Sequence, residues 1–218
     1  MLTVAIRALY VALPGAALLL VTAPAAAAEA PRYDAAKYSQ LPTACDVLAS
    51  HPDDPGRVAP GRTQKQIAED YPGTIAACRN ALERDPDNPR LHYQLARVLG
   101  YSGQGKLAMP HRARAIEARY PQGLFVNGFL YLTGLNENPK DVCRAGELIR
   151  ASAVEGRLAG QVGYPYYLLE GTFDGCTGIQ ADKVELLGFL DAAQRQVGGD
   201  FYQGLLIDLL RDEVNGLQ

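Results

Sequence analysis

The sequence predicts an all-α fold built from short antiparallel helix pairs. Residue usage is rich in Ala and Leu and poor in β-branched residues, which favours helices over strands. Between Leu91 and Tyr120, apolar residues recur at three- and four-residue spacing on both sides of a glycine-rich turn at 102–105. A hairpin of this size cannot bury both of its apolar faces alone, so we expect it to stack on further copies.

The N-terminal segment 1–28 has the features of a signal peptide. Arg7 supplies a basic start, an apolar run follows at 8–22, and small residues end the segment before Glu29. The alternative is an uncleaved membrane anchor, because the apolar run approaches the length that spans a bilayer. We therefore expect a periplasmic or secreted protein, and the Ala- and Arg-rich usage suggests a bacterial source.

Residues 29–63 are predicted to form an irregular N-terminal arm. The segment is rich in Pro, Asp and Gly, and prolines at 52, 55 and 60 exclude a long helix between His51 and Gly61. A short helix is expected at 44–50. Cys45 would anchor this otherwise loose arm to Cys78.

Residues 64–218 are predicted to be a helical repeat domain. A partial first unit covers 64–85, where Thr74 is a natural helix cap, and the hairpin at 91–120 is the second unit. Two more hairpins follow, and 201–214 forms a final amphipathic helix. Its polar face is expected to make a solvent-facing end cap through Asp208, Arg211, Asp212 and Glu213.

The segment 91–120 resembles a tetratricopeptide repeat. The residues that carry the resemblance are Leu95, Ala96, Leu99, Gly103, Ala108, Ala115 and Pro121. Three positions depart from the family: His92 stands where the family has Trp, Ala96 replaces Gly, and Arg112 stands where an aromatic residue is expected. The resemblance implies a short right-handed α-solenoid that binds another polypeptide.

Beyond Pro121 the pattern resembles a Sel1-like repeat, a relative with a longer inner loop. One copy is carried by Phe125, Gly128, Tyr131, Gly134, Asp141, Ala145, Leu148, Ala151, Ala153 and Gly156, and a second by Tyr167, Gly171, Leu186, Leu190, Ala192 and Ala193. Gly134 and Gly171 are 37 residues apart, which is closer to the Sel1 period than to the tetratricopeptide period of about 34. The two resemblances together cover roughly 64–197.

The four cysteines are predicted to form two disulfides, because an exported chain reaches an oxidising compartment. Four cysteines allow three pairings. Cys45 to Cys78 and Cys143 to Cys176 each span 33 residues, close to one helical hairpin, which favours these sequential pairs. A metal site is the alternative, but there is no Cys-x-x-Cys and the histidines do not cluster, so we expect neither a metal nor a cofactor.

Composition and motifs argue against nucleic-acid binding and catalysis. The formal net charge is −3 and no basic run appears, so neither nucleic acid nor anionic lipid is an expected partner. The chain lacks the nucleophile, zinc-protease and phosphate-loop motifs, so we do not expect an enzyme. Packing or solvent exposure is the favoured account of His51, His92 and His111, and the acidic tract 85–88 is predicted to be a turn.

The tetratricopeptide resemblance implies a concave groove lined by the inner helices. The residues at the matching positions are Arg90, Tyr93, Arg97, Tyr101, Phe125, Phe129 and Tyr166. The first four lie on one helical face, and aromatic and guanidinium groups suit peptide contacts and carboxylate recognition. The alternative is that they simply decorate an exposed helix.

The leading hypothesis for function is a non-catalytic scaffold or adaptor whose groove holds another polypeptide. One alternative is an accessory or substrate-positioning module of cell-wall peptidoglycan metabolism, with Glu170 and Asp174 as candidate carboxylates. A second alternative is a small-ligand or sugar binder that uses Tyr164, Tyr166 and Tyr167.

Overall fold

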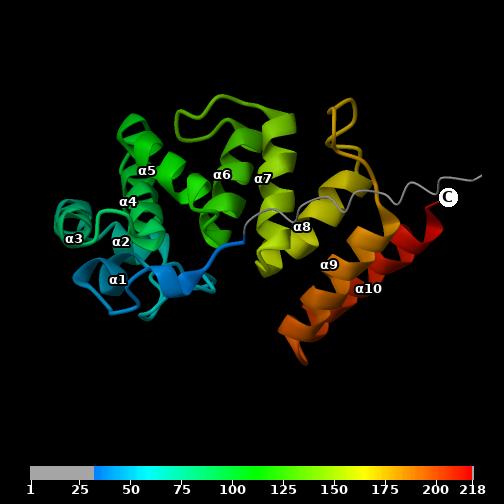
Figure 1. Cartoon of the computed structure of the whole chain (residues 1–218), viewed down its shortest axis with the longest axis horizontal. Coiled ribbons are helices and arrows are strands. Elements are labelled where there is room, and N and C mark those ends of the chain that lie inside the picture. The colour runs from blue at the N-terminus through cyan, green and yellow to red at the C-terminus, as the bar shows by residue number, and fades with distance from the viewer. Residues whose placement is uncertain (1–31, 218) are drawn as a thin grey trace, which may run out of the picture. The chain divides into compact units, whose positions relative to one another are not determined.

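The structure, a computed structural model, describes residues 32–217, and this range is all-helical, as predicted (Figure 1). The predicted signal peptide lies outside the described residues. Within 32–217 the elements are a 3-10 turn Ala35–Lys37 and the helices α1 Ala44–Ala49, α2 Gln64–Ile67, α3 Tyr71–Arg84, α4 Pro89–Tyr101, α5 Gly105–Glu117, α6 Pro121–Thr133, α7 Val142–Val154, α8 Leu158–Leu169, α9 Lys183–Val197 and α10 Phe201–Gly216.

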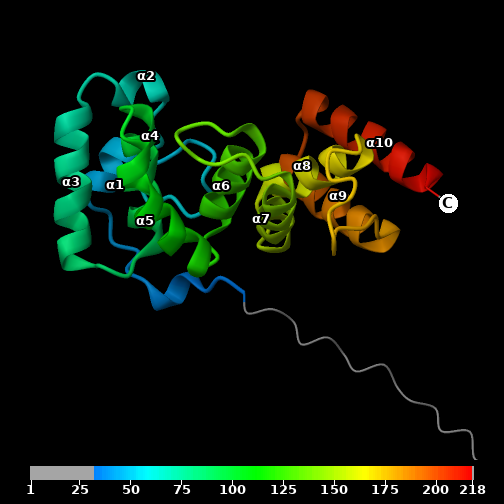
Figure 2. The same ribbon diagram turned by 90° about the horizontal axis from the view of Figure 1, so that it is seen from above.

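Consecutive helices pack against one another from α3 to α10, and they follow one another in chain order in Figures 1 and 2. Contacts between alternate helices join α4 to α6 and α8 to α10. The short helix α1, which the sequence predicts at 44–50, packs against both α3 and α4. The arm therefore belongs to the packed fold.

Most helices begin at a polar side chain that accepts a backbone hydrogen bond. Asp70 caps α3, Asn88 caps α4 and Asp141 caps α7. The prediction that Thr74 is a cap was wrong, because α3 begins at Tyr71 and Thr74 lies buried inside it. A proline in the first helical turn has no required N–H partner, so Pro72 does not break the helix.

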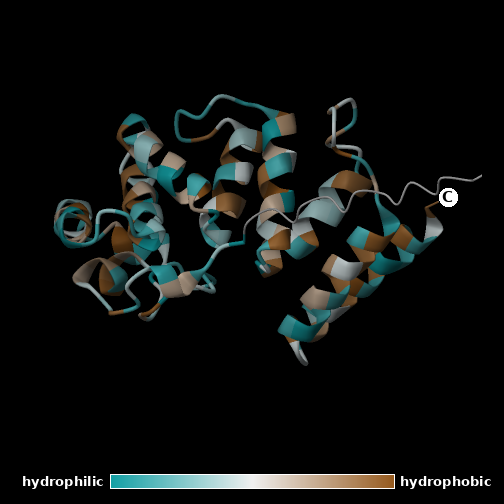
Figure 3. Cartoon of the chain, viewed as in Figure 1, coloured by the Kyte–Doolittle hydropathy of each residue, from teal (hydrophilic) through white to brown (hydrophobic). Residues whose placement is uncertain are grey.

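Two apolar clusters form the core of residues 32–217. One lies among α1 to α5 and the other among α7 to α10. A small third cluster contains Tyr93, Ala115 and Tyr120. Figure 3 shows apolar and polar residues alternating along the helices, while the loop between α6 and α7 is largely hydrophilic.

Each disulfide reinforces one of the two large clusters. Cys45 is bonded to Cys78, joining α1 to α3 with a Cα separation of 4.4 Å. Cys143 is bonded to Cys176, joining α7 to the long connection between α8 and α9 with a Cα separation of 5.3 Å. These are the two pairs that the 33-residue spacing favours, and they indicate an oxidising compartment.

Helices α6 and α7 approach closely at Gly128. A Cβ atom placed on this glycine would lie 2.6 Å from Ile149 Cγ1 and 3.2 Å from the Ala145 carbonyl oxygen. The helices can therefore approach this closely only because residue 128 has no side chain. Gly188 in α9 differs, since a Cβ there would meet no atom within 4 Å.

In the terminal helix α10, Asp208, Asp212 and Glu213 are exposed and Arg211 is part-exposed, as expected from the sequence. Ile207, Leu210 and Val214 are buried, whereas the exposed face also carries large apolar residues. They are Phe201, Tyr202, Leu205, Leu206 and Leu209. In 32–217, no helix is both long and apolar enough to span a bilayer.

Candidate functional site

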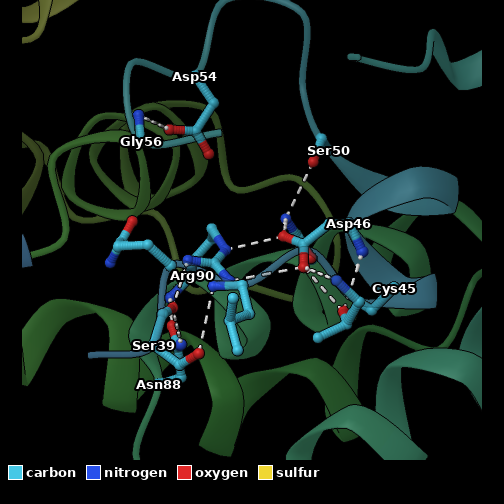
Figure 4. Close-up of polar contacts among 12 residues, drawn as sticks. Ser39, Cys45, Asp46, Ser50, Asp54, Gly56, Asn88 and Arg90 are labelled. Carbon is cyan, nitrogen blue, oxygen red and sulfur yellow. Dashed lines mark hydrogen bonds and ion pairs between the residues drawn. The ribbon is translucent and has the colours of Figure 1, made fainter. Parts of the chain in front are cut away.

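The N-terminal arm covers one face of α4 through a buried ion pair. Arg90 Nε lies 2.8 Å from Asp46 Oδ1, and the two side chains are 2% and 0% exposed. Arg90 also donates to the Ser39 carbonyl, so its guanidinium lies between Ser39 and Asp46 in Figure 4. Gln94 and Thr43 donate further hydrogen bonds to the Asp46 carboxylate. The charge pair is thus fully enclosed and hydrogen-bonded.

Arg97 binds the C-terminal end of α1. Its Nη1 donates to the carbonyl oxygens of Ala49 and Ser50, each at 3.0 Å, and its Nη2 donates to the Arg62 carbonyl at 2.7 Å. The last carbonyls of a helix lack partners within the helix and carry partial negative charge, which a cation stabilises. Arg97 therefore fastens the arm to α4.

A second anchor ties the arm to Tyr120. The Tyr120 hydroxyl donates to Asp54 Oδ2 at 2.7 Å. Asp54 Oδ1 accepts from the Gly56 amide at 2.9 Å (Figure 4). Asp54 is fully buried, and this burial raises the pKa of its carboxyl group above the usual range. Besides the Cys45–Cys78 disulfide expected from the sequence, the arm is therefore held by hydrogen bonds that the sequence did not predict. These bonds satisfy polar groups of α4 and of Tyr120 that would otherwise be buried without partners.

The groove expected along α4 is consequently filled by the chain itself at Arg90 and Arg97. Both guanidinium groups are buried and satisfied by the arm, which leaves them no open face on this side. Sequence spacing placed them on one helical face, which is right. It did not show that residues 39–62 cover that face.

A cavity of about 480 Å³ lies among α4, α5, α6 and the loop after α6. Four of the predicted binding residues line it: Tyr93, Arg97, Tyr101 and Phe129. The remaining lining residues are His51, Gln64, Ala96, Gly100, Arg112, Ala115, Val126, Asn127, Leu130, Leu135 and Asn136. No Asp or Glu is among them, so the charged lining is cationic.

Small residues make room for this cavity. Ala96, Gly100 and Ala115 present little or no side chain to it. A Cβ placed on Gly100 would lie 3.1 Å from Asn136 Nδ2 and 3.3 Å from Arg112 Nη2. Asn136 and Arg112 therefore pack closely against Gly100, where a larger side chain would crowd both polar groups.

Arg112 lies in the wall of the cavity. Its residue is 5% exposed, and its Nη1 donates to the Asn136 carbonyl at 3.1 Å and to Asn138 Oδ1 at 3.2 Å. Throughout 32–217, neither Nε nor Nη2 of this side chain has a hydrogen-bond partner, and no carboxylate lies within ion-pair distance. Burial lowers the pKa of Arg112, and the nearby Tyr131 and Glu137 partly oppose that effect.

The aromatic lining has a buried end and an open end. Tyr93 is buried and its hydroxyl accepts from Gln122 at 3.2 Å, and burial raises the pKa of Tyr93 far above its usual range. The Arg97 guanidinium carbon lies 5.1 Å from the ring centroid of Tyr101. Phe129 is 39% exposed, so the cavity opens where an apolar ring faces solvent.

His51 adds a neutral imidazole to the wall. Burial, followed by the charge of Arg97, lowers the pKa of His51 to about 4. Its Nδ1 accepts a hydrogen bond from the Asp53 amide at 3.1 Å, which requires an unprotonated Nδ1. At neutral pH the ring is therefore uncharged, and the two arginines supply the positive charge.

Two histidines that the sequence treats as separate lie together. His92 Nε2 is 2.8 Å from the Pro86 carbonyl and so donates to it, which leaves Nδ1 to accept from His111 Nδ1 at 2.9 Å. Burial lowers the pKa of His92, and burial with the neighbouring His92 and Arg79 lowers that of His111 to about 4. The expectation that the histidines do not cluster was wrong for His92 and His111, because α4 and α5 pack against each other across their turn.

The remaining predicted residues lie outside the cavity. Phe125 is partly buried beneath the Arg157 guanidinium, and Tyr166 is exposed on α8 against Tyr167. Tyr164, from the proposed sugar-binding cluster, is buried against Phe173.

Other candidate chemistry is sparse in the described part of the chain. The candidate carboxylates Glu170 and Asp174 are both exposed. Between residues 32 and 217, no group of three or more His, Cys, Asp or Glu side chains could hold a metal ion.

Sequence reasoning missed Arg112, His51 and Asn136 as lining residues. Arg112 did carry a signal, since it departs from the repeat pattern by placing a charge where an aromatic is expected. His51 and Asn136 come from the arm and from a loop, where no helical periodicity applies. Compared with family models, curated proteins and solved structures, the chain matches none of them, so its function is argued from this geometry.

Proposed function

We propose that this chain is an exported, non-catalytic interaction protein that holds a segment of another polypeptide in the cavity among α4, α5 and α6. The observation that carries the proposal is the cavity itself: about 480 Å³, preformed, with an apolar mouth at Phe129 and Leu135. Such a site buries an anchoring side chain together with part of its backbone.

The helices from α3 to α10 are proposed to be degenerate repeats of the tetratricopeptide and Sel1-like kind, arranged as a right-handed solenoid. Sequential packing supports this arrangement. Turn glycines support it further, because Gly103, Gly134 and Gly171, which follow α4, α6 and α8, all adopt positive φ, between 69° and 75°. Such repeats commonly serve as binding surfaces.

Export is proposed through the segment 1–28, to the periplasm or outside the cell. The two disulfides support an oxidising compartment. Both bonds lie in packed parts of the fold, one joining α1 to α3 and the other joining α7 to the connection between α8 and α9.

A small-ligand binder is the second candidate, and the cavity volume favours it. Ligand pockets fall in the range of about 300 to 1,000 Å³, and this cavity lies within that range.

Crosslinking from the cavity mouth tests the polypeptide proposal. A photoreactive phenylalanine analogue replaces Phe129, and a matched control replaces Val184, which is 81% exposed on α9 and does not line the cavity. We expect one defined protein adduct from position 129 after irradiation in the native compartment, and none from position 184.

Filling the cavity supplies the specificity control. Gly100→Leu adds a side chain that starts within about 3.3 Å of the Arg112 guanidinium and extends into the cavity, and leucine is well accepted in a helix. The adduct should disappear in this variant while helical content is kept. An adduct of unchanged yield would overturn the proposal. Tyr93→Ala and Arg97→Ala are unsuitable, because both side chains are buried structural contacts.

A further inference from the structure

The charges around the cavity are unbalanced. Arg97 and Arg112 line it and both are buried, yet no carboxylate lies within ion-pair distance of either anywhere in 32–217. The contrast is Arg90, which is equally buried and is paired with Asp46 at 2.8 Å. Burying a charge without a counter-charge is unfavourable, so an anion entering this cavity would be stabilised.

Only one of the two guanidiniums has donors to offer. Arg97 directs Nη1 and Nη2 at three carbonyl oxygens and Nε at the Tyr101 hydroxyl, 3.3 Å away. Arg112 uses Nη1 alone, which leaves Nε and Nη2 on the adjacent edge of the planar group. That edge is the one that binds both oxygens of a carboxylate side-on.

A second donor converges on the same place. Asn136 Nδ2 and Arg112 Nη2 lie 3.1 and 3.3 Å from the point where a Cβ on Gly100 would stand. Asn136 has positive φ of 53°, and its carbonyl is held by Arg112 itself, so the loop and the guanidinium are positioned together. The two donor atoms therefore lie close to each other beside the Gly100 backbone, in the wall of the cavity.

Apolar groups line the same cavity as these two donors. Val126, Phe129, Leu130 and Leu135 line the same cavity, and the imidazole of His51 is neutral at pH 7. The complementary ligand is therefore not a bare inorganic anion. It carries its charge next to an apolar group.

Resting on the proposed function, we infer that the cavity takes a ligand that presents a carboxylate to Arg112 and Asn136 with an apolar or aromatic group beside it. Two sources share this chemistry: the C-terminal residue of a polypeptide and a free aromatic or aliphatic acid.

The test compares acids with their isosteric neutral amides by NMR titration of the disulfide-bonded protein. The probes are phenylacetate against phenylacetamide, and acetyl-Ala-Leu-Phe with a free carboxylate against its C-terminal amide. In the wild type we expect saturable shifts in α4, α5 and α6, with each acid binding at least tenfold tighter than its amide. If the peptide acid binds tenfold more tightly than phenylacetate, the natural ligand is the C-terminus of a polypeptide. If the two bind with equal affinity, the natural ligand is a free acid.

Variants at Arg112 separate recognition from folding. Arg112→Gln should remove the acid preference, bringing acid and amide within about threefold, while the amide affinity is unchanged. Arg112→Lys keeps the charge but loses the planar pair of N–H donors that binds both carboxylate oxygens. It should therefore weaken acid binding about tenfold and retain a preference for the acid. The matched control Arg150→Gln breaks a surface pair with Glu185 and should leave both affinities unchanged.

Two results would overturn the inference. One is equal binding of acid and amide to the wild type, which would leave the crosslinking proposal for Phe129 intact. The other is an acid preference that survives in the Arg112→Gln variant while the backbone NMR spectrum of that variant is otherwise native. A third result concerns only the polypeptide proposal. If crosslinking from position 129 is not specific while the protein still prefers acids over amides, the polypeptide proposal alone is rejected.

Discussion

Breaking the Arg90–Asp46 pair is predicted to release the N-terminal arm from α4. The perturbations are Arg90→Met, which keeps the apolar stem, Asp46→Asn, which keeps the shape, and the double variant. Each single change leaves the other group buried with its charge uncompensated.

The magnitude follows from the enclosure of this pair. Removing one partner of a buried ion pair destabilises a protein by about 3 to 5 kcal/mol, because the remaining charge stays out of water. Asp46 retains hydrogen bonds from Gln94 and Thr43, so Arg90→Met should lie near the lower end of that range and Asp46→Asn near the upper end. The double variant removes both charges, and it should be more stable than the sum of the single changes predicts by about 2 kcal/mol.

Urea unfolding with intact disulfides, followed by circular dichroism at 222 nm, measures these free energies of unfolding. Limited proteolysis of residues 39–62 reports arm release directly, and both single variants should be cleaved faster than the double variant. Free energies that add within about 0.5 kcal/mol would refute the reasoning, since that result means the two charges do not interact in the fold.

Three further changes test the packing, titration and disulfide arguments. Gly128→Ala should destabilise the protein by about 1 to 3 kcal/mol in urea unfolding because α6 and α7 must separate, whereas Gly188→Ala, facing open space, should stabilise it by up to about 1 kcal/mol; equal effects would contradict the close approach. His111, whose pKa of about 4 lies below the unfolded value near 6.5, binds a proton more readily in the unfolded chain, so stability should fall as pH drops from 7 toward 4. His111→Gln should lessen the loss between pH 7.5 and pH 5 by about 1 kcal/mol, allowing for solvent screening at a half-buried ring, and an identical pH profile would refute this. Replacing Cys143 and Cys176 together by Ser opens a 33-residue loop and should cost about 3 to 4 kcal/mol, seen as a fall in melting temperature of roughly 10 °C, and an unchanged melting temperature would count against it.

Local patterns in the chain predicted the helices well. The three- and four-residue spacing of apolar side chains located α4 and α5 on either side of the turn at Gly103, and prolines excluded a long helix between 51 and 61. The equal 33-residue intervals favoured the two cysteine pairs found in the structure. Such features depend on neighbours close along the chain, which a sequence displays directly.

Contacts between distant segments were the part that sequence patterns did not reveal. Nothing local in Asp46 or Asp54 shows that each meets a partner 44 or 66 residues away, at Arg90 and Tyr120. The open α4 face and the scattered histidines were therefore expected incorrectly, and the polar contacts of the arm were not predicted, all for the same physical reason. Those outcomes depend on which faces meet after the chain folds.

The sequence alone determined the all-helical class, the turns and the identity of the bonded cysteines, because periodicity, capping and spacing act over short range. Only the tertiary structure decided which charges are paired and which are not. It neutralised Arg90 through the arm, and it left Arg112 beside Gly100 with two unused donors, because burial and charge compensation depend on segments that come together only in the folded state.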